Sequence, residues 1–310
     1  MLPPPPTRQP QIGFLYLPPY RVQGWTIAGE ESVVQVPELD VCFDIGRCPR
    51  IALTSRFVAL SHGHMDHSAG LPYYFSQRHF QGMDTGTVIC HEKIAGPIQN
   101  VMNAWVDLEA QQTPHRIVPL EPDQEFPVKP HIHLRAFATG HTVPSLGFVL
   151  VERRKKLRAQ FAGLDQEALL ALKQQGQQIT ETIQIPQVCY TGDTMWGDHF
   201  DRPDVLEARI LITECTFLEP GHRHRASVGR HLHLDDVIVL LKRSQATAVV
   251  LVHLSRRTHI AAARRVLDRV IPADQRPRVH LLMDNRTNRK RYEQQLHDDE
   301  QDGGEPAGRP

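Results

Sequence analysis

The sequence has 310 residues, of which 40% are hydrophobic, so the chain can bury a sizeable core without disulfides or a structural metal. Lysine plus arginine and aspartate plus glutamate each number 35, and this balance gives no reason to expect a nucleic-acid partner unless basic residues cluster locally. Histidine is abundant, with 18 residues, which indicates metal or acid–base chemistry.

The cysteines and the N-terminal residues indicate in which cellular compartment the protein is expected. The five cysteines are scattered and include no C-x-x-C pair, which excludes a disulfide framework and a cysteine zinc knuckle. The N-terminus lacks the charged and apolar regions of a signal peptide, and no apolar run approaches the ~20 residues of a membrane span. We therefore expect a cytoplasmic protein without a membrane association.

Short β-type runs recur along the chain and are followed by helical patterns, which together predict an α/β layered fold with mixed sheets. The predicted strands cover residues 25–27, 32–36, 41–45, 57–60, 87–90, 132–138, 146–151, 187–190, 210–213 and 248–252. The predicted helices cover residues 93–108, 164–174, 234–242 and 260–270.

Three segments differ from the folded domain that we predict over residues 13–293. Residues 1–12 are proline-rich and residues 294–310 are acidic and rich in glycine and proline, so both are predicted to be disordered. Residues 151–186 open with E-R-R-K-K-L-R and lie between two strands that could have been joined directly. Two interpretations of this segment remain, an inserted arm and a solvated amphipathic helix.

The stretch S-H-G-H-M-D-H-S-A-G, residues 61–70, directly follows a predicted strand. His62 and His64 are two positions apart, so an extended backbone presents both on one side, where they can share one ion. Asp66 and His67 lie at the turn into a helix and suit a neighbouring ion. Four ligand-type residues in six positions therefore predict a dinuclear metal site.

Further ligands must come from elsewhere, and three later strand ends supply them. His141, Asp193 and His253 each follow an apolar run directly. Loops at strand ends are where α/β sheets build active sites, because the rigid sheet fixes positions while the loops carry the chemistry.

The order H-x-H-x-D-H, single His, G-D-T and strand-end His resembles the metallo-β-lactamase fold, an αββα sandwich of two mixed sheets flanked by helices. More narrowly, the sequence resembles ribonuclease Z, the tRNA 3′-end processing endonuclease, in its short plant form. Four passages carry this likeness, namely G-W-T-I-A-G with F-D-I-G-R-C-P, then S-H-G-H-M-D-H-S-A-G-L-P, then T-E-C-T-F-L-E, and finally G-R-H-L-H-L-D-D-V with V-H-L-S-R-R.

The resemblance implies two zinc ions per subunit, although His and Asp ligands also take manganese or iron. It implies that one ion is bound by His62, His64 and His141. It implies that the other ion is bound by Asp66, His67 and His253, and that Asp193 bridges the two. It also implies that Asp44 in F-D-I-G orients the metal loop. A turn-forming aspartate before Gly46 explains Asp44 equally well.

Cleavage of a phosphodiester with a poor leaving group calls for a general acid as well as an activated water. The resemblance assigns the acid to Glu214 in T-E-C-T together with His231 in H-L-H-L, and it places Asp66 beside the water, to take up or orient its proton. We expect His222, His224 and His233 to be loop or capping residues, with His233 beside Asp235 at a helix start.

The predicted arm lies where ribonuclease Z inserts its tRNA-gripping arm. Five basic residues and one acidic residue, Glu152, give the start of the arm a local charge of +5 − 1 = +4. The basic residues form a patch that could attract phosphate, and they are Arg153, Arg154, Lys155, Lys156 and Arg158. The Gly-Pro turn common at the arm tip of bacterial forms is absent, which predicts a short helical arm. Ser255 and Arg257 match a family stretch that could contact a phosphate.

The leading hypothesis is therefore a dinuclear-zinc endonuclease that removes the 3′ trailer from precursor tRNA and acts as a homodimer. The alternative keeps the chemistry and changes the substrate to a small phosphodiester such as a cyclic nucleotide. A binding protein with a vestigial site is disfavoured because every expected ligand is present.

Overall fold

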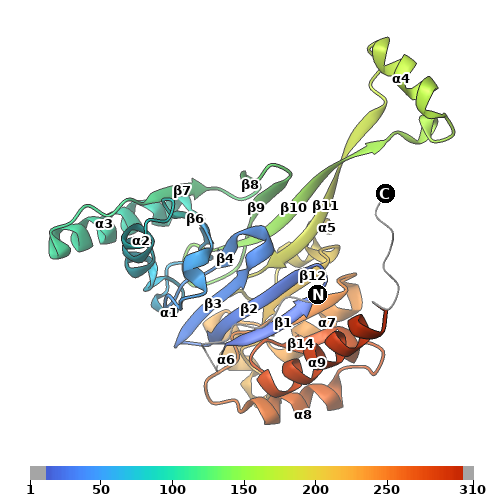
Figure 1. The fold of residues 1–310 in the computed structure, drawn as a ribbon. Coiled ribbons are helices and arrows are strands. Elements are labelled where there is room, and N and C mark those ends of the chain that lie inside the picture. Colours follow the sequence, from blue (N-terminus) through green and yellow to red (C-terminus); the bar gives the residue numbers. More distant parts are fainter. Residues whose placement is uncertain (1–11, 303–310) are drawn as a thin grey trace.

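The computed structural model describes residues 12–302. Within this range the strands form two seven-stranded sheets that lie against each other, with helices on both outer faces (Figure 1). This arrangement confirms the predicted αββα sandwich of two mixed sheets. The expected N-terminal proline-rich tail, residues 1–11, lies outside the described residues, as does the C-terminal segment 303–310.

The first sheet runs in the order β1 to β7, antiparallel from β1 to β4 and parallel from β4 to β7. Its strands are β1 (Gly13–Leu17), β2 (Tyr20–Ile27), β3 (Glu31–Val36), β4 (Val41–Phe43), β5 (Phe57–Ala59), β6 (Thr87–His91) and β7 (Arg116–Leu120).

The second sheet repeats that plan with four antiparallel strands, β8 to β11, followed by parallel pairing out to β14. Its strands are β8 (Glu125–Lys129), β9 (Ile132–Ala138), β10 (Leu146–Leu157), β11 (Thr180–Tyr190), β12 (Ile210–Glu214), β13 (Ala248–Val252) and β14 (Val279–Leu281).

Helices cover the outer faces of both sheets, except for α4 (Gln166–Gln174), which lies away from the sheets at the tip of the β10–β11 hairpin. They are α1 (Met65–Ser68), α2 (Leu71–Phe80), α3 (Glu92–Glu109), α4 (Gln166–Gln174), α5 (Pro203–Leu206), α6 (Arg223–Gly229), α7 (Leu234–Arg243), α8 (Ile260–Val270) and α9 (Asn285–Asp302). No helix among residues 12–302 combines the length and apolar character that crossing a membrane requires.

Three apolar layers hold these elements together. The inner layer joins the facing sides of the two sheets and contains Phe43 and Phe148, both fully buried. On the outer faces, α2 and α3 pack on the first sheet through residues such as Phe75 and Met102, and α7 and α8 pack on the second. Each fully buried large side chain contributes roughly 1.5–3 kcal/mol, so this sandwich is a rigid support for the loops at its edges.

The segment 151–186 is the outer part of the β10–β11 hairpin with α4 at its tip, and Figure 1 shows it projecting away from the two sheets. The strands run six residues further on the β10 side and seven on the β11 side than the sequence patterns predicted. The tip is helical, with Asp165 capping α4 through a hydrogen bond from Ala168 N of 2.8 Å.

The C-terminal region differs from the prediction in one respect. We expected residues 294–310 to be disordered, whereas α9 continues through residue 302. Its packing explains the difference, because Gln295 Nε2 donates to Tyr16 O over 3.1 Å and the Phe14 and Tyr292 rings meet edge to face at 5.2 Å. The tertiary contacts outweigh a composition that lacks an apolar stripe.

Substituting Gly46 with alanine should destabilise the fold, because the added Cβ would lie 1.9 Å from Asp66 O and 2.5 Å from Asp66 C. Backbone must then move, and overpacking of this kind costs about 1–3 kcal/mol. We expect denaturant unfolding of the metal-free protein to show that loss. Gly163→Ala at the arm tip, where nothing lies within 4 Å of the new Cβ, should leave the free energy of unfolding unchanged; equal stability of the two variants would contradict the packing argument.

Candidate metal centre

The predicted ligands meet at one edge of the sandwich, where strands of both sheets end. The loop after β5 brings His62, His64, Asp66 and His67. His141, Asp193 and His253 follow β9, β11 and β13 of the second sheet. Side chains that are 186 positions apart in the sequence thereby come into contact.

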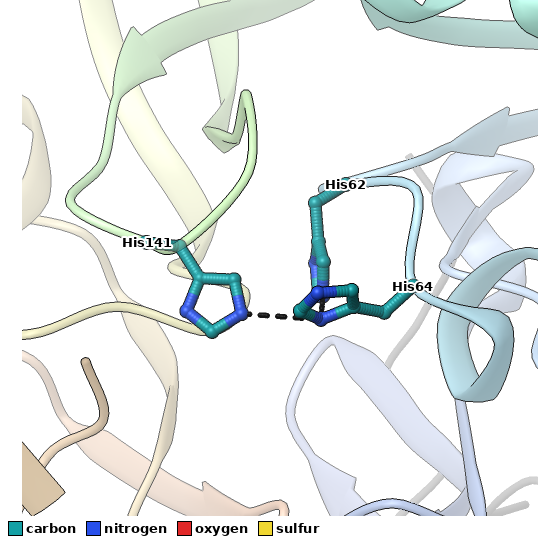
Figure 2. A group of neighbouring side chains, drawn as sticks. All are labelled: His62, His64 and His141. Carbon is teal, nitrogen blue, oxygen red and sulfur yellow. Dashed lines mark hydrogen bonds between the residues drawn. The ribbon is translucent and has the colours of Figure 1, made fainter. Parts of the chain in front are cut away.

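The first group consists of His62, His64 and His141. His64 Nδ1 lies 3.0 Å from His62 Nε2 and 3.3 Å from His141 Nε2. Figure 2 shows His141 reaching across from its own loop toward the two histidines that follow β5. For a tetrahedral ion with bonds of 2.0–2.1 Å, ligand atoms lie about 3.3 Å apart, so these three nitrogens have the spacing of ligands to one ion.

The second group consists of Asp66, His67 and His253. Asp66 Oδ2 lies 3.5 Å from the Nε2 atoms of both His67 and His253, and those two nitrogens are 3.3 Å apart. These distances again match the edges of a coordination tetrahedron.

Asp193 lies between the two groups. Its Oδ2 atom is 3.3 Å from the Nε2 atoms of His67 and His253 and 3.9 Å from His62 Nε2. One carboxylate oxygen therefore contacts ligands of both groups, which is the position that a bridging ligand requires.

The remaining nitrogen of each buried ligand histidine faces an acceptor. His67 Nδ1 lies 2.8 Å from Asp44 Oδ2, and His141 Nδ1 lies 3.2 Å from Arg230 O. Ser61 Oγ donates to Asp44, so it accepts from His62 Nδ1 at 2.9 Å.

Thr216 is the acceptor for the outer nitrogen of His253, the histidine that follows β13. Its Oγ1 donates to Glu214 Oε2 over 2.5 Å and therefore accepts from His253 Nδ1 at 3.1 Å. These contacts assign the ring proton to Nδ1 and leave the Nε2 lone pairs pointing inward. Several lone pairs and the Asp66 and Asp193 carboxylates then face one another, although Gly29 N donates to Asp66 Oδ2 over 2.9 Å, and a bound cation would be stabilised among them.

The electrostatics of the cluster agree with this. Burial, followed by the nearby His67, lowers the pKa of His62 to about 2, and burial also lowers the pKa values of His64 and His141. These imidazoles are thus neutral at pH 7, as metal ligands must be. Burial opposes a charge on His67, but the Asp193 and Asp44 carboxylates outweigh it and raise the pKa of His67, so this place favours positive charge.

Asp44 has the positioning role rather than only a turn-forming one. It is fully buried and has a left-handed backbone, with φ of 58°. Its carboxylate accepts from Ser61 N over 2.6 Å, from Ser61 Oγ over 2.8 Å and from Tyr190 OH over 2.7 Å, in addition to its contact with His67. The aspartate therefore orients the loop that carries four of the candidate ligands.

Glu214 and His231 form a pair beside the cluster. His231 Nδ1 lies 3.0 Å from Glu214 Oε1, which also accepts from Thr194 N over 2.7 Å. Burial lowers the pKa of His231, but the Glu214 carboxylate outweighs it and raises the pKa to about 9. His231 is 3.9 Å from Asp193 Oδ2, so an imidazole whose raised pKa favours its charged form lies next to the candidate ligands.

Other histidines and basic residues lie elsewhere. His233 is the N-cap of α7, in a capping box with Asp236, which confirms the expected capping role. Ser255 forms a β-bridge with Ala28, and Arg257 is exposed just beyond it. The arm residues lie on the projecting hairpin, away from the sheets (Figure 1).

Sequence reasoning missed three residues that support the site, namely Tyr190, Thr216 and Arg230. Arg230 Nη1 donates to His141 O over 2.7 Å while Arg230 O faces His141 Nδ1, so the segment before His231 is tied to a ligand of the first group. Thr216 and Arg230 stood within the T-E-C-T-F-L-E and G-R-H-L-H-L-D-D-V passages and Tyr190 ended a predicted strand, but nothing in the sequence indicated the contacts that they make.

Comparisons with known proteins agree with this geometry. Residues 49–254 match the beta-lactamase superfamily domain. Two relatives from Arabidopsis thaliana are tRNase Z TRZ2, chloroplastic, 33% identical over 79% of this chain and 70% of the relative, and tRNase Z TRZ1, 32% identical over 77% and 86%. The crystal structure of the short form of human tRNase Z shares the fold, with a TM-score of 0.54 at 16% identity over 87% of this chain and 95% of that one.

Replacing Asp44 with asparagine should weaken metal binding by about 10–100-fold, the usual effect of losing an outer partner of a ligand histidine. The amide cannot accept all the hydrogen bonds that the carboxylate accepts, and it no longer holds His67 Nδ1–H. Competition with a chromophoric zinc chelator measures the affinity. Asp40→Asn is the matched control, because Asp40 has the same φ of 58° and lies in a turn; equal affinities in the two variants would show that Asp44 only forms the turn.

Proposed function

The chain belongs to the tRNase Z family of the beta-lactamase superfamily and is a metal-dependent hydrolase of that kind, and from this we propose that it is an endonuclease that removes the 3′ trailer from precursor tRNA. The observation that carries the proposal is the contact between Glu214 and His231 beside the ligand cluster. A hydrolase that expels a ribose 3′-oxygen needs such a proton donor, because the alkoxide is a poor leaving group.

We propose two zinc ions as the cofactors, one in each ligand group, with Asp193 between them. The support is the spacing of the ligand atoms, close to 3.3 Å in both groups, and a donor set of histidines and aspartates. When bound, two such ions lower the pKa of a water and neutralise charge on a phosphate oxygen.

The chain's own residues supply the proton transfers. Asp66 stays a carboxylate, because contacts with His253 and His67 lower its pKa against the effect of burial, and it can accept or orient the proton of the attacking water. Protonated His231 donates to the 3′-oxygen as the P–O3′ bond breaks, and Glu214 stabilises its positive charge. The products are a tRNA with a 3′-hydroxyl and a trailer with a 5′-phosphate.

The projecting hairpin is our candidate for holding the tRNA. Arg153 pairs with Glu125, and Arg154 pairs with Glu152 over 2.6 Å, so these two arginines are partly neutralised. Lys155 and Lys156 are exposed, and no carboxylate in residues 12–302 pairs with them. These two lysines are therefore among the arm cations that have no carboxylate partner in residues 12–302, as are Arg158 and Lys173, and a phosphate backbone would meet them first.

Three further statements belong to the proposal. We propose that Ser255 and Arg257 contact a substrate phosphate, that Arg158 adds to the arm's positive charge, and that the protein is a homodimer in which one arm serves the other subunit's site. The support is the family membership. The expected cytoplasmic location also stays a proposal, since TRZ2 is described as chloroplastic. Light scattering of the purified chain tests the dimer.

Incubation with a trailer-bearing precursor tRNA and zinc or manganese should release the trailer and leave a 3′-hydroxyl on the tRNA. His64→Ala should abolish cleavage by removing a ligand, and Glu214→Gln should lower kcat by about 10²–10⁴-fold because His231 loses the charge that keeps it protonated. End-labelled precursor on a denaturing gel measures both. A metal-loaded wild-type protein that leaves the precursor intact would refute the proposal.

Replacing both Lys155 and Lys156 with alanine should raise KM for precursor tRNA several-fold with little change in kcat. The salt dependence of binding should become shallower by about two in the log–log slope, roughly one for each phosphate that a lysine neutralises. The control is Arg265→Ala with Arg269→Ala, two exposed arginines on α8, which Figure 1 shows at the opposite end from the arm. Unchanged KM and slope in the arm variant would favour a small phosphodiester as the substrate.

A further inference from the structure

An apolar cavity of about 320 Å³ lies beside the first ligand group. It is enclosed by the first three turns of α3, the start of α2 and the loop after His141, through residues that include Leu71, Ile94, Ile98, Val101, Met102 and Pro144. Its volume is at the lower end of the range for small-molecule pockets, about 300–1,000 Å³. A single nucleobase fits in such a space, and a base pair does not.

The lining favours an uncharged group. No lining residue carries a formal charge, and the two polar side chains are His64 and Ser68. His64 Nδ1 is directed to the ligand cluster, and Ser68 Oγ donates to the carbonyls of Gly63 and His64. The cavity therefore offers van der Waals contact without base-edge readout, which suits sequence-tolerant binding of a base.

The cavity adjoins the candidate reaction centre at His64, which lines it, and Pro144 follows three residues after His141. The His64 and His141 rings are 5.0 Å apart and the His141 and His231 rings are 5.2 Å apart, but His231 does not line the cavity. The cavity therefore reaches the cluster at His64, whereas His231 reaches it at Asp193, over 3.9 Å. A phosphate held at the cluster would thus meet His231 and the cavity at different points.

We propose that this cavity binds the base of the first trailer nucleotide, the one immediately 3′ of the bond that is cut. The inference rests on the proposed function. Proton donation by His231 places the departing 3′-oxygen, and with it the last nucleotide of the tRNA, at His231. The phosphate stays on the trailer, so the next nucleoside leaves the centre at a different point, where the cavity opens.

A second copy of this chain is the competing occupant. From the rim of the cavity onward, α3 exposes Val101, Trp105 and Leu108 at spacings of four and three residues, with 49%, 43% and 73% of their surfaces accessible. Such a stripe suits helix pairing. The base is favoured because the cavity shares a side chain, His64, with the ligand cluster, whereas Trp105 and Leu108 lie outside it.

The test combines a substrate change with a protein change. One precursor carries an abasic nucleotide at the first trailer position, and a second carries it at the second trailer position. Val101→Glu places a charge at the rim of the cavity. Val239→Glu on α7 is the matched control, since Val239 is also a helical valine, with 46% of its surface accessible, and it does not line the cavity.

With the wild type, loss of the first trailer base should lower kcat/KM about tenfold, within the range that base stacking on protein surfaces gives. Loss of the second base should change it less than twofold. Val101→Glu should lower kcat/KM about tenfold on the intact precursor and cause no further loss on the precursor lacking the first base. Val239→Glu should behave as the wild type, and both variants should keep the wild-type metal content and oligomeric state.

Three results would overturn the assignment. The first is equal cleavage of the intact precursor and the precursor that lacks the first trailer base, and the second is additive losses from Val101→Glu and the abasic site. The third is a change of oligomeric state in Val101→Glu, which would show that a second copy of the chain occupies the cavity. Failure of the wild type to cut any precursor is a different outcome, because it removes the proposed function itself.

Discussion

Asp44 is the point at which the two sheets and the ligand loop are joined. It follows β4 of the first sheet, and its carboxylate accepts a hydrogen bond from Tyr190, the last residue of β11 in the second sheet. The Tyr190 ring stacks on Phe43 at 4.7 Å, so a polar and an apolar contact fix the same junction. A fully buried carboxylate without donors would be strongly unfavourable. The surrounding loop must therefore stay in the conformation that supplies those donors, and that conformation also orients His67.

The two sheets have the same strand plan but contribute candidate ligands to the centre in different ways. Each has four antiparallel strands followed by parallel pairing, and the carboxyl ends of the inner strands face the same edge. The first sheet provides one compact loop with four candidate ligands. The second provides single residues from three strand ends, and His253 has a left-handed backbone, with φ of 55°. Strain of this kind persists only where the surroundings determine it, and here the His253 N–H donates to Thr26 Oγ1 over 2.9 Å.

The sequence predicted the sandwich and the convergence of the candidate ligands, because ligand type and spacing within S-H-G-H-M-D-H are local and each later candidate follows an apolar run. The role of Asp44 could not be decided from the sequence, since it depends on Tyr190, 146 positions away. Strands β1, β7, β8 and β14 were not predicted. Strands β7 and β8 each contain a proline and are mostly not buried, so they lack the apolar run that marked the predicted strands. The outer part of β10 is almost entirely polar, and that of β11 is polar apart from Ile183 and Ile185, so their mutual pairing largely specifies them.

The contacts of the arm change what its charge implies. The sequence count of +4 treats every basic residue as free, yet Glu125, which lies outside the counted segment, pairs with Arg153 and also with Arg135. Because the paired arginines stiffen the base of the hairpin, their charge supports the position of the arm more than it attracts phosphate. Lys155, Lys156, Arg158 and Lys173, which have no carboxylate partner among the described residues, would give only a few phosphate contacts and a moderate salt dependence. If the arm holds precursor tRNA as proposed, recognition by so few cations must depend on the shape of the arm and its distance from the centre, which fits the way proteins read A-form helices through backbone geometry.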